Sequence, residues 1–244
     1  MFTSENILFE WLTHYFNDAG AYASTFTITN NCAFTIWPAT LTGGGTPQLP
    51  STGFELTPKG SMTLDVPVAW SGRFWARTEC STDKHGRFTC ATGDCGSGQV
   101  PCNGAGGTPP VSLVELTLAP NREGLDFYDV SLVDGFNLPV SVAPQGCNTT
   151  SCSADVNRIC PPNFAVKGSD GRSVIACKSA CLALNQPEYC CTGPFASPDK
   201  CSPTPYSVVF KNQCPQAYTY AYDDKSSTFT CSGGPNYYSI TFCP

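Results

Sequence analysis

The fold is decided by residues 86–102, GRFTCATGDCGSGQVPC, where glycine-rich turns separate three closely spaced cysteines. The whole chain carries sixteen cysteines in 244 residues, an even number. None of them forms the C-x2-C knuckle that zinc sites favour, and only two histidines are present to complete a metal shell. We therefore expect disulfides formed in an oxidising compartment, and we expect no metal and no cofactor.

The composition narrows the class of protein. Apolar residues make up 41% of the chain, which is enough for a sizeable core and excludes intrinsic disorder. The formal net charge of −6 comes without any basic run, which argues against nucleic acid and anionic membranes as partners. No apolar run reaches the roughly 18–20 residues of a membrane span, so no transmembrane segment is expected. One large all-β unit, or a β core with an attached segment held by disulfides, fits this length.

The first 24 residues differ from the rest of the chain. They end in Ala21-Tyr22-Ala23, a small-x-small sequence typical of signal-peptidase sites. The preceding stretch lacks a basic region, and three acidic residues interrupt its apolar residues. Residues 1–24 are interpreted as a leader or an aberrant signal segment, with an amphipathic helix as the alternative. The mature chain is expected to begin near Ser24 or Thr25, and residues 1–20 are expected to pack poorly against the core.

From residue 25 onward the pattern is one of short strands. Residues 25–29 alternate polar and apolar side chains, and 34–37 repeat the pattern until Pro38 closes it. Gly43-Gly44-Gly45 lacks the Lys-Ser/Thr of a phosphate-binding loop and is interpreted as a flexible hairpin loop. Regular spacing between turn signals predicts a β-sandwich or barrel. The further predicted strands are 61–66, 72–78, 111–118, 127–133, 140–143, 217–222, 227–231 and 237–242.

Between residues 147 and 214 the strands fade. Half of the cysteines lie in residues 147–201, and residues 176–184 predict a short helix. Thr204-Pro205 is typical of a helix N-cap followed by proline at the first helical position. The following residues, 206–210, have strand propensity, so the local signals disagree there. Such a loop-rich segment depends on its disulfides for stability.

The stretch at 86–102 resembles the signature of thaumatin-like proteins, the plant pathogenesis-related family five. The resemblance extends over about 25–244, and all sixteen cysteines have counterparts in the family. Because it involves many separate motifs, the chain is identified as a member of this family on sequence grounds. The further matching stretches are 26–32, 72–78, 130–137, 189–192 and 241–244.

The resemblance implies a mostly β fold with an acidic cleft. A β-sandwich core is expected over about 25–78, 111–153 and 215–244, with disulfide-rich subdomains over about 79–110 and 154–214. The family also has a helix over residues 206–211, against the local strand propensity. Its disulfide pattern implies eight pairs, namely Cys32–Cys243, Cys80–Cys90, Cys95–Cys102, Cys147–Cys231, Cys152–Cys214, Cys160–Cys177, Cys181–Cys190 and Cys191–Cys201.

Antifungal members of the family share one arginine and four acidic residues that line the cleft. Four carboxylates around one guanidinium focus negative potential and raise the pKa of a carboxyl group. The fifth position falls on the Asp223-Asp224 pair, of which Asp224 is preferred. The corresponding residues here are Arg73, Glu115, Asp129, Asp134 and Asp223 or Asp224.

The family implies a secreted antifungal defence protein of the apoplast or vacuole, expected to be a monomer. Its expected partner is β-1,3-glucan of fungal walls or another fungal surface component, and Phe127, Tyr128, Phe136 or Tyr222 would offer ring faces to a sugar. The alternative is a weak endo-β-1,3-glucanase with Glu115 as general acid and Asp129 as nucleophile or base. A storage, sweet-taste or antifreeze-like role on the same scaffold is a further alternative.

Two other sequence features bear on function. A serine or cysteine nucleophile is disfavoured, because His85 is the only histidine outside the leader and the cysteines are expected in disulfides. Asn148 lies in an N-x-T sequon and is a weak candidate for glycosylation, which would fit a secreted route.

Overall fold

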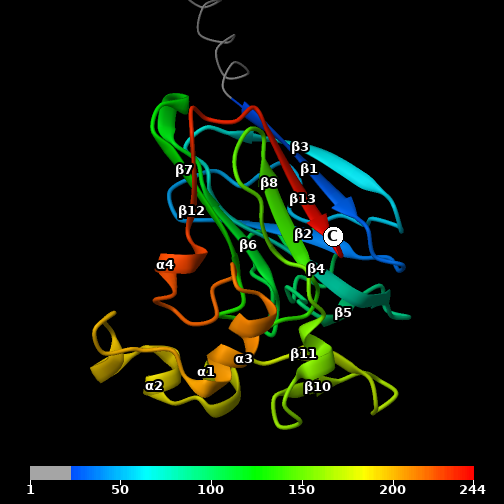
Figure 1. Ribbon diagram of the computed structural model, residues 1–244. Helices are drawn as coiled ribbons and strands as arrows, with labels where there is room; N and C mark the ends of the chain where they lie inside the picture. The colour runs from blue at the N-terminus through cyan, green and yellow to red at the C-terminus, as the bar shows by residue number, and fades with distance from the viewer. Residues whose placement is uncertain (1–22) are drawn as a thin grey trace, which may run out of the picture.

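Two large β-sheets form the centre of the computed structural model, which describes residues 23–244 (Figure 1). The predictions for residues 1–20 lie outside the described residues. The first strand, β1 (Ala23–Asn30), already includes Ala23 and Ser24. Ser24 is buried, and its hydroxyl donates a hydrogen bond to the Pro235 carbonyl at 2.8 Å. The sandwich therefore begins at or slightly before the predicted start of the mature chain.

The first sheet has five strands and joins the two ends of the described chain. Its order is β3 (Ser61–Pro67), β1, β13 (Tyr237–Phe242), β8 (Val140–Pro144) and β9 (Thr150–Cys152). Strands β1 and β13 run parallel, and the other neighbours are antiparallel. This parallel pair brings Cys32 and Cys243 together just beyond the strand ends, where they form a disulfide.

The second sheet carries the candidate site residues. Its order is β12 (Phe229–Ser232), β7 (Leu125–Ser131), β6 (Leu113–Thr117), β4 (Ser71–Thr82) and β2 (Trp37–Thr42). A sixth strand, β5 (Phe88–Thr92), pairs with the far end of β4. All of these pairings are antiparallel.

The core lies between the two sheets. Phe74, Val114 and Val130 face each other across three neighbouring strands and are fully or almost fully buried. From the opposite sheet, the Phe26 ring stacks on Phe74 and on Tyr238, with centroid separations of 5.6 and 4.4 Å. Because side chains alternate along a strand, this packing turns the intervening residues of the second sheet outward. The predicted β-sandwich is confirmed.

All sixteen cysteines are paired, and the pairs are the eight that the family resemblance implies. The disulfide-rich segment between β9 and β12 contains only short elements. These are the hairpin β10 (Ala165–Lys167) and β11 (Val174–Cys177), the 3-10 turns η2 (Val156–Ile159) and η3 (Gly193–Phe195), and helices α1 (Ala180–Leu184), α2 (Pro187–Cys190), α3 (Pro205–Gln213) and α4 (Asp224–Ser227). None of the helices described in residues 23–244 is long and apolar enough to cross a membrane.

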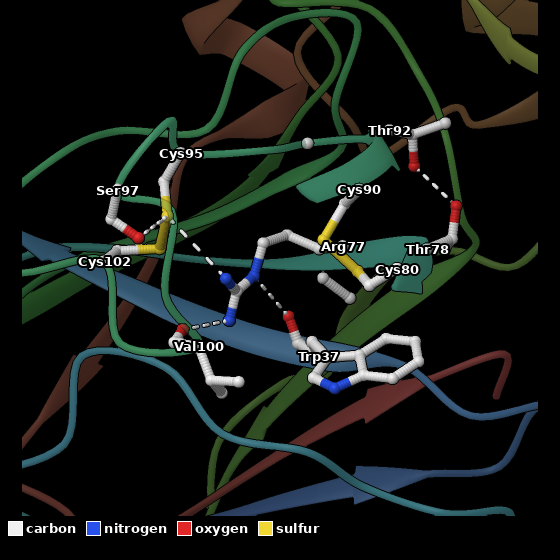
Figure 2. The surroundings of a disulfide bond; sticks show 12 residues. Trp37, Arg77, Thr78, Cys80, Cys90, Thr92, Cys95, Ser97, Val100 and Cys102 are labelled. Carbon is white, nitrogen blue, oxygen red and sulfur yellow. Dashed lines mark hydrogen bonds between the residues drawn. A yellow bond between two sulfur atoms is a disulfide. The ribbon is translucent and has the colours of Figure 1, made fainter. Parts of the chain in front are cut away.

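A fully buried arginine ties the disulfide loop of residues 93–102 to the second sheet (Figure 2). Arg77 donates from Nε to the Trp37 carbonyl at 3.1 Å and from Nη2 to the Val100 carbonyl at 2.7 Å. Burial lowers the pKa of Arg77 to about 10, with a smaller opposing effect of Asp94. A Cβ at Gly53 would come within 2.7 Å of Arg77 Nη2, so only glycine fits beside the guanidinium.

The structure differs from the sequence expectations in several local places, and β5, β9, β10 and β11 lie where no strand was predicted. The strand predicted at 34–37 begins only at Trp37, and Pro38 does not end it but lies inside β2, an edge strand of the second sheet that tolerates its missing N–H. Residues 217–222 do not form a strand, since only Tyr218 makes a bridge, to Ser131. The helix predicted at 176–184 is shorter, because residues up to Cys177 belong to β11.

The disagreement between local signals at residues 204–210 is resolved in favour of a helix. The Thr204 side chain accepts a hydrogen bond from the Ser207 N–H, and the Ser207 hydroxyl caps the Thr204 N–H in return. This capping box and Pro205 at the first helical turn outweigh the strand propensity of residues 206–210.

Candidate functional site

Arg73, Glu115 and Asp129 form one row across three strands of the second sheet. Arg73 on β4 lies opposite Glu115 on β6, and Glu115 lies opposite Asp129 on β7. The residue after each of them faces the core, so all three side chains project from the outer face. In directly opposed antiparallel pairs, Cβ atoms are about 4.5–5.5 Å apart. The row thus places one guanidinium and two carboxyl groups side by side.

Two more acidic residues approach this row from outside the sheet. Asp134 follows β7, and its Oδ2 lies 3.9 Å from Arg73 Nη1. Asp224 begins α4, and its Oδ1 accepts a hydrogen bond from the Tyr218 hydroxyl at 3.0 Å. Because Tyr218 also bridges Ser131 at the end of β7, the segment 217–224 forms a wall beside the outer face of the sheet.

Two hollows share Glu115 and Asp129 and together make a cleft. The first, with a volume of about 440 Å³, extends from Arg73 past Phe127 to the loop at Gly43 and Gly44. The second, of about 410 Å³, also includes Asp134, Tyr218 and Asp224. The structure therefore brings together five of the six candidate residues: Arg73, Glu115, Asp129, Asp134 and Asp224.

Asp223 is not part of the cleft. Its Oδ2 lies 2.9 Å from Lys211 Nζ and accepts hydrogen bonds from the N–H and hydroxyl of Thr219 at 3.1 and 3.0 Å. Its Oδ1 accepts a hydrogen bond from the Ser226 hydroxyl at 3.0 Å. These contacts fix Asp223 beneath the wall segment, which leaves the neighbouring Asp224 as the acidic residue that lines the cleft.

Asp129 has the most perturbed environment of the cleft acids. Burial, together with the smaller effects of the negative charges of Glu115 and Asp224, raises the pKa of Asp129 to about 8. Its Oδ1 is buried and has no hydrogen-bond partner within residues 23–244. Both observations favour the neutral carboxylic acid at Asp129 near neutral pH.

Glu115 differs from Asp129 in having partners that favour its charge. Burial raises the pKa of Glu115, and the negative charge of Asp134 raises it too. The Arg73 guanidinium and a hydrogen bond with Ser131 act in the opposite direction. No described group lowers the pKa of Asp129 in this way. When the pair holds one proton, that proton is therefore on Asp129 and Glu115 is ionised. This order is the reverse of the roles assigned from the sequence, where Glu115 was the acid.

Among the four aromatic candidates, Phe127 is the one that lines the cleft. It is 45% exposed and lies two residues before Asp129 on the same face of β7. Tyr128 and Phe136 are buried in the core, and Tyr222 lines neither hollow. Asn148 is exposed between β8 and β9, where its predicted glycosylation stays a prediction.

The sequence reasoning missed Tyr218 and Ser131 as neighbours of the acids. Ser131 could have been found from strand parity, because it lies two residues after Asp129 on β7. Tyr218 carries no such signal, since its position depends on the irregular segment after α3 and not on a strand.

Several known proteins are similar to this chain. The Thaumatin family model matches residues 30–244. The chain is 67% identical to "Thaumatin-like protein 1" of Pyrus pyrifolia over 230 residues, which cover 93% of both chains. It is 59% identical to "Glucan endo-1,3-beta-glucosidase" of Prunus avium over 229 residues, 92% of both chains. A solved thaumatin-like xylanase inhibitor, TLXI, aligns with 24% identity and a TM-score of 0.49, over 90% of this chain and 99% of that one.

Proposed function

The chain belongs to the thaumatin family, and we propose that it is a secreted defence protein whose acidic cleft binds β-1,3-glucan or another component of fungal surfaces. The observation that carries this proposal is the row of Arg73, Glu115 and Asp129 on the outer face of the second sheet. The eight disulfides fit a protein that works outside the cell, where reduction would not threaten them.

The cleft offers groups that suit a polyhydroxyl ligand. Ionised carboxylates accept hydrogen bonds from sugar hydroxyls, and the Arg73 guanidinium donates them. The exposed Phe127 ring beside the row provides apolar surface for the C–H face of a pyranose. The two hollows share Glu115 and Asp129, so together they offer more room than either alone, as a chain of sugar units requires.

A weak endo-β-1,3-glucanase activity is the second candidate. It is favoured by the contrast between the two paired carboxyls, because a glycosidase needs one neutral acid and one carboxylate at the scissile bond. Asp129 would then protonate the leaving oxygen, and ionised Glu115 would act as nucleophile or base. The name of the Prunus avium relative points in the same direction.

The decisive experiment measures laminarin binding and reducing-sugar release by the same preparations. We expect Arg73→Ala to weaken laminarin binding about tenfold, the value of a lost charge-assisted hydrogen bond. Glu55→Gln, an exposed acid on neither hollow, is the matched control and should bind as the wild type does. Equal binding by wild type, Arg73→Ala and Glu55→Gln would reject the cleft as the glucan site.

The same preparations separate binding from hydrolysis. If the protein is a glucanase, Glu115→Gln and Asp129→Asn should each lower reducing-sugar release at least a hundredfold, the range for loss of an acid–base group. If both variants release sugar at the wild-type rate while Arg73→Ala loses binding, the cleft binds glucan without hydrolysing it.

A further inference from the structure

Another pocket is lined by residues of β4, of β11 and of the C-terminus, among others. Figure 1 shows these three segments on the side of the molecule away from α4. We call this pocket the lateral pocket. It has a volume of about 570 Å³ and shares no lining residue with either hollow of the cleft. Its lining residues are Phe34, Thr35, Trp37, Thr78, Glu79, Asn137, Leu138, Pro139, Asp155, Asn157, Val174, Ile175 and Cys243.

The walls of the lateral pocket are mainly apolar and firmly held. Phe34 is 48% exposed, although it is a large apolar side chain. Cys243 is joined to Cys32, and β11 ends at Cys177, which is joined to Cys160. Since disulfides fix two of its walls, the pocket is preformed and needs little ordering when a ligand binds.

Several side-chain oxygens of the lateral pocket are hydrogen-bond acceptors that other groups leave uncommitted. Asn137 uses both amide hydrogens, donating to the Ala76 carbonyl at 2.8 Å and to the Thr92 hydroxyl at 2.9 Å. Asn157 donates to the Asn137 carbonyl at 3.1 Å, whereas its Oδ1 is buried without a partner in the described chain. The carboxylates of Glu79 and Asp155 are exposed and belong to no ion pair within residues 23–244.

The charge of the pocket lining has one sign. Among residues 23–244, Glu79 and Asp155 are its ionisable residues, and no lysine, arginine or histidine of that range lines it. A pocket with apolar walls and two unpaired carboxylates complements a ligand that carries positive charge on an apolar body. An ammonium group has three donors and no acceptor, so it also suits the uncommitted oxygens of Asn157, Glu79 and Asp155.

We propose that the lateral pocket binds a small organic cation, namely an ammonium group attached to an apolar ring or chain. The apolar body lies against Phe34, Leu138 and Ile175, and the ammonium group lies toward Glu79 and Asp155. This site is independent of the glucan-binding proposal, because the two sites share no residue.

Isothermal titration at pH 6 and low salt with 2-phenylethylammonium tests this proposal, with 2-phenylethanol as the neutral ligand of nearly equal shape. We expect saturable binding of the ammonium compound, at least tenfold tighter than that of the alcohol. Glu79→Gln and Asp155→Asn should each weaken it about threefold, and both together about tenfold, as partly exposed ion pairs do. Asparagine at 155 can still cap η2, a role in which Asp155 Oδ1 accepts from the Asn157 N–H.

Glu115→Gln is the control, because the cleft is also acidic and could attract a cation. That variant should bind the ammonium compound with wild-type affinity. Chemical-shift changes at the methyl groups of Val174 and Ile175 on titration would locate the ligand in the wild-type protein without any substitution. The proposal is overturned if the alcohol binds as tightly as the ammonium compound, or if Glu115→Gln weakens binding while the Glu79→Gln/Asp155→Asn variant does not.

Discussion

Asp223 and Asp224 are neighbours in the chain, yet the two carboxylates lie in opposite environments. Asp223 is 9% exposed and meets an ammonium group, two hydroxyls and a backbone N–H. Asp224 lines the cleft, where its side chain accepts a hydrogen bond from the Tyr218 hydroxyl. The same contrast separates Asp126, buried and bonded to Ala119 N–H and the Tyr238 hydroxyl, from Asp129 in the cleft.

This difference shows which acidic side chains of the fold remain able to bind a ligand. The interior acids have partners for their charge, so they contribute to stability and have little left to offer a ligand. The cleft acids face one arginine, and Asp129 has a buried oxygen with no hydrogen-bond partner in the described part of the chain. Binding groups that the chain itself does not satisfy are available to a ligand, at some cost in stability.

The largest effect on stability is expected from removing an interior acid, Asp223. Asp223→Ala should lower the free energy of unfolding by about 3–5 kcal/mol, because it leaves the partly buried Lys211 ammonium group without its counter-ion. Asp224→Ala, one residue away, should change it by less than about 1 kcal/mol. Guanidinium denaturation of the oxidised proteins measures both values. Equal losses in the two variants would contradict the division into interior and cleft acids.

The sequence could predict the fold because two independent patterns agree. The alternation in residues 25–29 is that of β1, and the cysteines match those of the family along the whole chain. Pro38 was wrongly predicted to end a strand. It lies in an edge strand, and whether a strand lies at the edge of a sheet depends on tertiary structure and cannot be seen in the local sequence. The helix α3 shows the converse, because its capping box is local and outweighs strand propensity.

The candidate site could be predicted in part. Strand parity already separates Phe127 and Asp129 from Tyr128, so the burial of Tyr128 could have been expected from its place beside Asp129. The choice between Asp223 and Asp224 could not, since it depends on where Lys211 of α3 meets an irregular segment. The pKa order of Glu115 and Asp129 likewise depends on Arg73 and Ser131, which are contacts between strands.

A smaller effect of opposite sign is expected at Asp129. Its pKa is near 3.8 in the unfolded chain and about 8 in the folded protein, so between these values the folded state binds one more proton. Stability contributed by this group is therefore present below about pH 4 and is lost as the pH rises through about 8. Asp129→Asn cannot ionise and should be more stable than the wild type at pH 8 but not at pH 4, with a difference that grows as the pH rises between these values.

Thermal unfolding of wild type and Asp129→Asn across pH 4–8 measures this difference. Asp65→Asn is the matched control, because Asp65 is exposed on β3 and lies outside the cleft. Parallel stability curves for wild type and Asp129→Asn would show that Asp129 is ionised in the folded protein over this range. That result would also remove the basis for Asp129 as the acid of a glucanase.

The smallest effect on stability is expected at Asp134, whose ion pair with Arg73 is long and open to solvent. The two side chains are each 39% exposed and 3.9 Å apart, so Asp134→Asn should change the free energy of unfolding by less than about 0.5 kcal/mol. Its electrostatic effect on the cleft should nevertheless be measurable. The charge of Asp134 raises the pKa of Glu115, and its loss also leaves Arg73 free to interact with Glu115. Both changes favour ionised Glu115, so a carbon-13 titration of its carboxyl group should show a lower pKa in Asp134→Asn than in the wild type. An unchanged or higher pKa would mean that the charge of Asp134 does not act on Glu115. The acidic residues would then be independent surface charges and not one electrostatically coupled cleft.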